Sequence, residues 1–336
     1  MSPSSGREDF SQHIPVLDVG DYLAGKPGAA SALATAIAEA LEQIGFMLFV
    51  GHDVPQSLID RTFTHAQRFH SQPLERKLEL RMNEHNNGYM AQGQYAIVSS
   101  EHNETDEPER NEAFFVKRER AANNAQIKAS RRLTGANLWP DDLPGFKETV
   151  VEYSNTMDAF AMRCLPALSA SLGMPAEYFT ERFQPSLFSV RLSHYPPAQP
   201  RENQFGIAPH SDSGFLTFLP QSAVPGLQVR MPDGSWVDIP NLPGSIAVNS
   251  GDTLRRWSNG RFKSTAHRAL PPTREHRYAI PFFFGPNLDT VIECLPTCTS
   301  ADLPPQWPPI TYEDWMLYWY DVNYNHKKQP SDNEPD

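Results

Sequence analysis

The first half of the chain is dominated by hydrophobic residues at helical spacing. Leu33, Ile37, Leu41 and Ile44 share one face of a predicted helix, which stops at Gly45 before a buried strand. Other apolar stretches repeat this pattern, and a helix rich in tryptophan and tyrosine closes the chain. Helices are predicted at residues 29–45, 58–70, 73–82, 150–172 and 311–325.

Short apolar runs replace the helical pattern after the long helix. Pro-Pro, Pro-Gly, Asp-Gly and Asn-Gly pairs separate these runs, and the chain contains 31 prolines. Strands are predicted at residues 187–195, 214–220, 227–230, 236–239, 245–249, 265–270 and 278–284. Many short strands with turn residues between them indicate an antiparallel barrel or sandwich.

Three stretches follow neither pattern. Residues 1–12 and 327–336 are polar and charged, and we expect both to be disordered tails, because they cannot bury enough apolar surface to offset the entropy of ordering. Residues 83–132 are polar and irregular, which predicts a long surface loop of the kind that forms a lid over a site.

Composition excludes several classes of protein. With 29 basic and 40 acidic residues, the formal net charge is −11, which disfavours a nucleic-acid partner. The longest apolar stretches are far shorter than a membrane span, and no signal peptide is evident at the amino terminus. The three cysteines show no paired spacing, so neither a disulfide framework nor a zinc ribbon is indicated. We expect a cytoplasmic protein.

A histidine and a carboxylate two residues apart occur twice in the sequence. His102 with Glu104 lies in the charged loop and is interpreted as solvated surface. His210 with Asp212 lies at the edge of a predicted strand, where alternation places both side chains on one face. Two metal ligands would therefore converge at residues 210 and 212.

Two imidazoles and one carboxylate form a ligand set that leaves adjacent positions of a divalent iron open for dioxygen and a chelating substrate. The second histidine must come from a distant strand. His267, His276 and His326 are the candidates downstream, and His267 is favoured because it lies within a predicted strand, 55 residues after Asp212.

Ten residues after His267, Arg277 opens a strand that is otherwise almost wholly apolar. A guanidinium is always charged and its fork of donors matches a carboxylate. Arg277 could therefore bind the distal carboxylate of a dicarboxylic acid beside the metal, or it could pair with a structural acid.

Together these residues resemble the isopenicillin N synthase-like family of Fe(II)/2-oxoglutarate-dependent dioxygenases. The resemblance covers about residues 13–326 and extends beyond the metal pattern. The additional similar stretches are Ile14-Pro-Val-Leu-Asp18, Gly45-Phe-Met-Leu-Phe-Val-Gly-His52, Asn87-Gly-Tyr89, Arg191-Leu-Ser-His-Tyr-Pro-Pro197, Asn249-Ser-Gly-Asp252 and Ser258-Asn-Gly260.

The resemblance implies a mainly β fold with flanking helices around a double-stranded β-helix, a jelly-roll core of the cupin type. The implied regions are a dioxygenase amino-terminal region at 13–135 containing the lid-like loop, a scaffold helix at 136–180, the Fe(II)/2-oxoglutarate jelly roll at 185–290, and a carboxy-terminal helix region at 291–326.

The resemblance also implies roles for particular residues. Iron is expected on the catalytic residues His210, Asp212 and His267, and 2-oxoglutarate is expected on Arg277, assisted by Tyr195 and Ser193. The family usually has a serine or threonine at the position of Ala279, and often an asparagine at the position of Ser193. These two departures concern the pose of the co-substrate and leave the metal ligands intact. From the residues themselves, substrate contacts are expected at Tyr89, Arg191, Phe205 and Phe284, and a buried structural ion pair is the alternative role for Arg191.

The expected reaction is the hydroxylation, desaturation or cyclisation of a small molecule in secondary metabolism, with Fe(II), 2-oxoglutarate and O2 as cofactors and with release of succinate and CO2. A monomer or weak homodimer is expected. One alternative is an oxidase of the isopenicillin N synthase type, which places the substrate's own carboxylate on Arg277 and uses no 2-oxoglutarate. The others are an ethylene-forming type of 2-oxoglutarate oxidase and a non-catalytic jelly-roll binding protein.

Overall fold

A computed structural model describes residues 14–93, 107–120, 124, 131–199, 201 and 203–323. The two predicted tails, residues 94–106, 121–123 and 125–130 of the predicted lid-like loop, and with them the His102–Glu104 pair, lie outside these residues.

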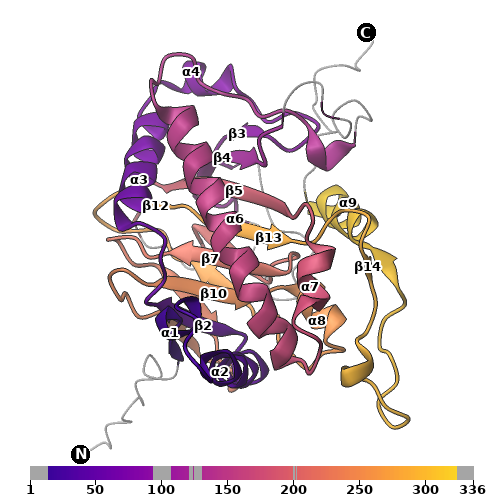
Figure 1. Ribbon diagram of the computed structural model, residues 1–336. Coiled ribbons are helices and arrows are strands. Elements are labelled where there is room, and N and C mark those ends of the chain that lie inside the picture. The colour runs from indigo at the N-terminus through magenta and orange to yellow at the C-terminus, as the bar shows by residue number, and fades with distance from the viewer. Residues whose placement is uncertain are drawn as a thin grey trace, which may run out of the picture.

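Helices and strands alternate in the first half of the chain, whereas strands dominate the second half (Figure 1). The helices are α1 Gly20–Leu23, α2 Ala29–Gln43, α3 Gln56–His70, α4 Leu74–Leu78, α6 Phe146–Ser171, α7 Glu177–Arg182, α8 Asp252–Trp257 and α9 Tyr312–Asn323. The amino-terminal strands are β1 Val16–Asp18, β2 Phe46–Val50, β3 Gly88–Met90 and β4 Glu112–Lys117. The remaining strands are β5 Leu187–Tyr195, β6 Ile207–His210, β7 Leu216–Pro220, β8 Leu227–Arg230, β9 Trp236–Asp238, β10 Ile246–Ser250, β11 His267–Ala269, β12 Arg277–Ala279, β13 Phe282–Gly285, β14 Val291–Ile292 and β15 Ile310–Thr311.

Two sheets form the core of the fold. The larger has nine strands in the order β1-β2-β10-β7-β13-β5-β4-β3, with β12 also paired to β5, and the smaller has the order β6-β11-β8-β9. All pairs within them are antiparallel except β1 with β2. The expected mainly β fold with flanking helices around a jelly-roll core is confirmed.

Alternation along β2 shows how the layers pack. Phe46 and Leu48 belong to a cluster shared with the smaller sheet, whereas Met47 and Phe49 belong to the cluster shared with the helices. The Phe49 ring lies 6.4 Å from that of Phe160 on α6, which crosses one face of the larger sheet in Figure 1. The larger sheet is therefore the middle layer, with helices on one face and the smaller sheet on the other.

The long helix begins earlier than predicted. Hydrophobic periodicity predicts residues 150–172, whereas α6 covers Phe146–Ser171 and follows Gly145, whose φ is +79°. Phe146 is fully buried, so the first turn packs on the sheet as well. Within the described ranges, no helix combines the length and the apolar character needed to cross a bilayer.

The prediction of a loop throughout residues 83–132 is wrong for two stretches. β3 and β4 lie within this range, and all six residues of β4 are buried beside β5. Glu112 and Lys117 make β4 look polar, but both side chains are hydrogen-bonded to partners distant in the sequence. The polar composition of β4 therefore predicts a loop wrongly, because its polar side chains are buried together with their hydrogen-bond partners.

Candidate active site

Three predicted metal ligands meet inside the jelly roll. The antiparallel pairing of β6 with β11 places His210 directly opposite His267. His210 Nε2 lies 3.8 Å and His267 Nε2 lies 3.7 Å from Asp212 Oδ1. All three side chains are buried. The structure thus brings together residues that are widely separated in the sequence.

Hydrogen bonds to the far side of each ring orient the two histidines. His210 Nδ1 donates to the Ala208 carbonyl at 2.8 Å, and His267 Nδ1 donates to the Thr265 carbonyl at 3.1 Å. Because a carbonyl only accepts, each Nδ1 carries a hydrogen, and Nε2 is the ring nitrogen of each histidine that can bind a metal. Burial, together with the adjacent His267, lowers the pKa of His210 to about 3. This imidazole is therefore neutral at neutral pH.

Asp212 is oriented in a comparable way. Its Oδ2 accepts hydrogen bonds from Thr217 Oγ1 at 2.6 Å and from Asn249 Nδ2 at 2.8 Å, so Oδ1 faces the two imidazoles. Burial by itself would raise the pKa of Asp212. The electrostatic interactions of the carboxylate with His267 and His210, together with the two hydrogen bonds, outweigh burial and hold that pKa below its ordinary value.

A glycine allows the loop beneath Asp212 to approach closely. The Asp252 backbone N–H donates to the Asp212 carbonyl at 2.7 Å. A Cβ atom at residue 251 would lie 2.3 Å from the Gly214 carbonyl oxygen and 2.7 Å from that of Asp212, so only Gly251 fits. The Asn249-Ser-Gly-Asp252 turn therefore holds both the backbone and the carboxylate of this ligand.

Four residues of β5 and β12 share one face of the larger sheet. Arg277 is directly opposite Tyr195, and Ala279 is directly opposite Ser193. Arg277 is 4% exposed, and its guanidinium carbon lies 4.7 Å from the centroid of the Tyr195 ring. Arg277 Nε and Nη1 and the Ser193 hydroxyl are buried without a hydrogen-bond partner. The predicted co-substrate residues are thus adjacent, with unused donors.

These residues fit the groups that the sequence implies. A buried cation is strongly unfavourable unless an anion accompanies it, so the unused donors of Arg277 suit a carboxylate. Gly226 keeps this space open, because a Cβ there would lie 3.3 Å from Arg277 Cδ and Nε. Two imidazole lone pairs and one carboxylate oxygen suit Fe(II) with open coordination positions.

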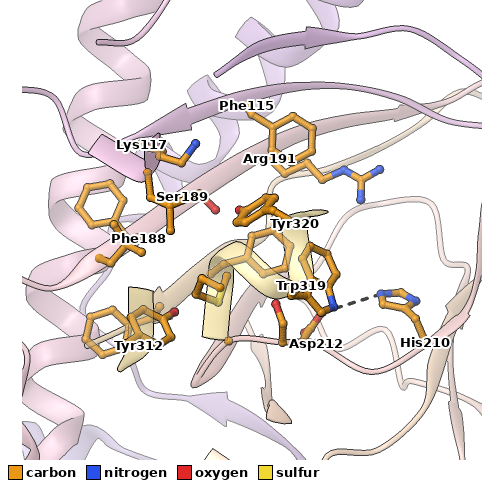
Figure 2. A pocket seen from close by; sticks show the side chains of 17 residues that line it. Phe115, Lys117, Phe188, Ser189, Arg191, His210, Asp212, Tyr312, Trp319 and Tyr320 are labelled. Atoms are coloured by element: carbon orange, nitrogen blue, oxygen red, sulfur yellow. Dashed lines mark ion pairs between the residues drawn. The ribbon is translucent and has the colours of Figure 1, made fainter. Parts of the chain in front are cut away.

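A pocket lies beside His210 and Asp212 (Figure 2). It contains about 740 Å³ of space between atoms, part of which is open to solvent. Aromatic side chains contribute much of the described lining, among them Phe115, Phe188, Phe284, Tyr312, Trp319 and Tyr320.

The four predicted substrate contacts divide into two pairs. Arg191 and Phe284 line the pocket. Tyr89 and Phe205 are not among its described lining residues. The Tyr89 hydroxyl hydrogen-bonds a carboxylate on the opposite face of the sheet, and the Phe205 ring lies 5.3 Å from the guanidinium of Arg268. The structure therefore does not bring Tyr89 or Phe205 to the pocket.

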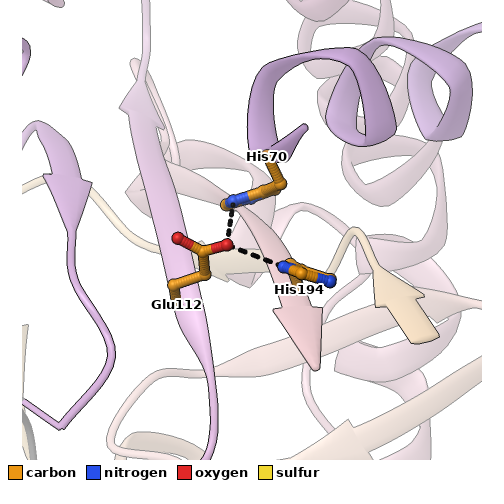
Figure 3. Close-up of side chains that lie close together, drawn as sticks. All are labelled: His70, Glu112 and His194. Atoms are coloured by element: carbon orange, nitrogen blue, oxygen red, sulfur yellow. Dashed lines mark hydrogen bonds and ion pairs between the residues drawn. The ribbon is translucent and has the colours of Figure 1, made fainter. Parts of the chain in front are cut away.

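A second group of two histidines and one carboxylate lies on the other face of the larger sheet (Figure 3). His70 ends α3, Glu112 begins β4, and His194 lies on β5 directly opposite Glu112. All three are buried, and their potential ligand atoms lie within 4.8 Å of one another. No spacing in the sequence signals this cluster, because its members come from three distant elements.

Hydrogen bonds distinguish this cluster from the metal site. Glu112 Oε1 lies 2.7 Å from His194 Nδ1 and 3.4 Å from His70 Nδ1. Glu112 Oε2 accepts from Lys77 Nζ at 2.7 Å and from the Tyr89 hydroxyl. His194, Lys77 and Tyr89 thus each direct a donor at the carboxylate, and the Lys77 donor is an ammonium. We therefore interpret the cluster as a buried ion-pair network.

Sequence reasoning missed the contribution of α9 to the site. The sequence predicts an aromatic helix at residues 311–325 but assigns it no role in the site. Trp319 and Tyr320 line the pocket, and Trp315 Nε1 donates to the Ser213 carbonyl at 3.0 Å, beside the metal ligands. The aromatic composition of residues 311–325 was the available signal, but composition alone does not show which face of a helix meets a cavity.

Comparison with known proteins identifies the family of the chain. Residues 187–286 match the 2OG-Fe(II) oxygenase superfamily, and residues 14–142 match the amino-terminal region described as non-haem dioxygenase in morphine synthesis. The chain is 34% identical over 322 residues to the 2-oxoglutarate-Fe(II) type oxidoreductase hxnY of Emericella nidulans, covering 92% of this chain and 90% of the relative.

Solved structures show the same similarity. A full-length Neurospora crassa protein in complex with alpha-KG and thymine superposes with a TM-score of 0.80 at 27% identity, over 92% of this chain and 96% of that chain. The rice dioxygenase for auxin oxidation superposes with a TM-score of 0.71 at 26% identity, over 92% of this chain and 95% of that chain.

These similarities confirm the expected family, activity and cofactors. The relatives are named as 2-oxoglutarate-dependent enzymes, and several of their structures contain 2-oxoglutarate, so an oxidase that uses no 2-oxoglutarate, an ethylene-forming oxidase and a binding protein are not favoured. The chain belongs to the superfamily of Fe(II)- and 2-oxoglutarate-dependent oxygenases and is a non-haem dioxygenase that uses Fe(II), 2-oxoglutarate and O2 to oxidise a small molecule.

Proposed function

We propose that His210 Nε2, Asp212 Oδ1 and His267 Nε2 hold the Fe(II) of this dioxygenase, and that Arg277 binds the distal carboxylate of 2-oxoglutarate. The observation that carries the proposal is the set of unused polar atoms on one side of the jelly roll. Both Nε2 atoms and Oδ1 face a common point, and Arg277 has buried donors without partners.

The Ser193 hydroxyl would donate a hydrogen bond to the distal carboxylate of 2-oxoglutarate, beside Arg277. Ala279 has no hydroxyl to offer, but Ser193 is its direct neighbour across the β5–β12 pair, and the Ser193 hydroxyl is buried and unpartnered. A donor from β5 would thereby replace one missing from β12. Tyr195, directly opposite Arg277, positions the guanidinium through its ring.

The residues of the chain position reactants and exclude water. Bound iron with 2-oxoglutarate supplies the oxidation by O2, with release of succinate and CO2. Thr217 and Asn249 keep Asp212 Oδ1 directed at the metal position. The aromatic lining surrounds the substrate beside that position and limits access of water to it. Arg191 and Phe284 are the predicted substrate contacts that we retain in this proposal.

The wider setting is also proposed from the sequence. We propose a cytoplasmic enzyme of secondary metabolism that acts as a monomer or weak homodimer. The three cysteines without paired spacing support the location. Size-exclusion chromatography with light scattering and fractionation of the source cells test the oligomeric state and the location.

Anaerobic titration of the Fe(II)-loaded chain with 2-oxoglutarate tests the site. A weak visible charge-transfer band is expected when the keto acid chelates ferrous iron, and Arg277→Leu should weaken 2-oxoglutarate binding about tenfold or more through loss of a charge-assisted contact. No band at one bound iron per chain, or an unchanged titration midpoint in the variant, would contradict the assigned roles. Succinate formation in air provides a separate check on the use of 2-oxoglutarate.

A further inference from the structure

The described lining of the pocket beside the metal ligands contains two basic side chains and one acidic side chain. Among its described lining residues Asp212 is the one acidic side chain, and in the proposed function it is a ligand to the metal. Lys117 and Arg191 line the same space. In the proposed function the charges of the metal, Asp212, 2-oxoglutarate and Arg277 balance one another. A preference for an anionic substrate would therefore come from the basic side chains of the lining.

The hydrogen bonds of Lys117 use all its donors. Its Nζ donates to the His85 carbonyl at 2.5 Å, to the Asn86 carbonyl at 2.8 Å and to Asn87 Oδ1 at 2.9 Å, and an ammonium has three donors. Burial also lowers the pKa of Lys117 to about 7, so it is only partly charged at neutral pH. Lys117 therefore serves mainly to hold the residues around it.

Arg191, in contrast, is a constant cation, because a guanidinium does not lose its proton in proteins. Its Nη2 donates to Asn111 Oδ1, and its guanidinium carbon lies 5.4 Å from the centroid of the Phe115 ring. Strand alternation places Arg191 and Phe115 on the face of the sheet that lines the pocket. In Figure 2 the guanidinium lies toward the His210 end, whereas Lys117 lies at the other end.

We propose that the substrate is a small ring-bearing carboxylate, whose carboxylate pairs with Arg191 and whose ring packs against the aromatic side chains of the pocket. The planar fork of Arg191 matches a carboxylate, and the two groups that fix its position pre-organise that fork. Phe284, Trp319 and Tyr320 supply flat apolar surface for a ring. This inference rests on the proposed function, because a molecule bound in this pocket is oxidised only if the metal site lies beside it.

Matched acids and amides test the charge requirement. The full-length chain is loaded anaerobically with Fe(II) and 2-oxoglutarate, and calorimetry measures the binding of phenylacetate against phenylacetamide, cinnamate against cinnamamide, and 2-naphthoate against 2-naphthamide. We expect the acid of at least one pair to bind about tenfold more tightly than its amide, which corresponds to one charge-assisted hydrogen bond.

Variants assign this preference to a residue. Arg191→Gln should abolish the preference for the acid, and Arg191→Lys, which keeps the charge, should retain part of it. Arg61→Gln is the matched control, because Arg61 is an exposed guanidinium on α3 outside the pocket lining. Circular dichroism verifies that each variant is folded. If Arg191→Gln does not fold, the preference for the acid is measured on Arg191→Lys, which should retain only part of it.

The outcomes separate this inference from the proposed function. If the wild-type protein gives no charge-transfer band with 2-oxoglutarate, the proposed function fails. If the band forms but no acid is preferred, none of the acids binds at about 10 mM, or the preference survives Arg191→Gln, only the substrate inference is overturned. Loss of the band in Arg191→Gln would assign Arg191 to the co-substrate and would also overturn it.

Discussion

Replacement of Glu112 by glutamine should lower the free energy of unfolding by about 3–5 kcal/mol. The carboxylate lies 2.7 Å from Lys77 Nζ, and the two side chains are only 10% and 8% exposed. At that distance and an effective dielectric constant of about 20, their attraction is on the order of 6 kcal/mol. Glutamine keeps the size and one acceptor but removes the charge. The ammonium would remain buried without a counter-charge. The expected loss in the free energy of unfolding is smaller than the full attraction, because the structure around the ammonium can relax.

The effect should also depend on pH with a defined sign. Burial alone would raise the pKa of Glu112, but contacts with His194, His70 and Lys77 outweigh it and hold the pKa far below its ordinary value. The carboxylate therefore stabilises the fold at pH values above the unfolded pKa of about 4.3. Below that value the unfolded chain gains a proton that the folded chain does not, so the advantage over Glu112→Gln should shrink by up to about 1.4 kcal/mol per pH unit.

Urea unfolding followed by circular dichroism and tryptophan fluorescence measures both effects, provided that the two transitions coincide. The double variant Lys77→Met/Glu112→Gln is the decisive control, because it removes both charges and leaves no isolated ion. We expect it to be more stable than Glu112→Gln alone. A single-variant cost below about 1 kcal/mol, or a double variant whose cost is the sum of the two single costs, would refute the ion-pair interpretation.

Three further predictions concern the metal and co-substrate sites. His210→Ala or Asp212→Ala should abolish oxygen consumption while circular dichroism remains native, because the ligands lie at the pocket rather than in the packed core; activity in either variant would refute the ligand assignment. Ser193→Ala should raise the dissociation constant of 2-oxoglutarate about tenfold in the anaerobic titration, and adding Ala279→Ser should restore part of the affinity, whereas an unchanged constant would exclude a role for the hydroxyl. Thr217→Val should weaken Fe(II) binding about 10- to 100-fold in a chelator competition assay, and equal affinity would show that its hydrogen bond does not orient Asp212.

Features that depend on short distances along the chain could be predicted from the sequence. The strand and helix runs of the jelly roll follow from periodicity, and the distance of two residues between His210 and Asp212 already places both ligands on one side of the chain. His267 required a choice among three downstream histidines, which rested on its place in a predicted strand. The structure places it directly opposite His210, where a cross-strand pair brings two rings together.

Features that depend on distant partners could not be predicted in this way. The sequence predicts a loop where β4 lies, because Glu112, Lys117 and their neighbours are polar and polarity usually indicates exposure. Its burial becomes favourable only because Lys77, His194 and backbone carbonyls near residue 86 satisfy these groups. None of these partners is marked as such by spacing in the sequence.

The two clusters of histidine and carboxylate show why residue type alone does not define a metal site. Both contain two imidazoles and one carboxylate with ligand atoms within 4.8 Å, and both are buried. At Asp212, the hydrogen bonds lie behind the ligand atoms, so the Nε2 atoms of both histidines and Oδ1 of Asp212 face one another. At Glu112, His194 directs its Nδ1 hydrogen at the carboxylate, and Lys77 already supplies the cation. The chemistry of each cluster is therefore decided by the neighbours that orient its protons, and these neighbours are assembled only by the fold.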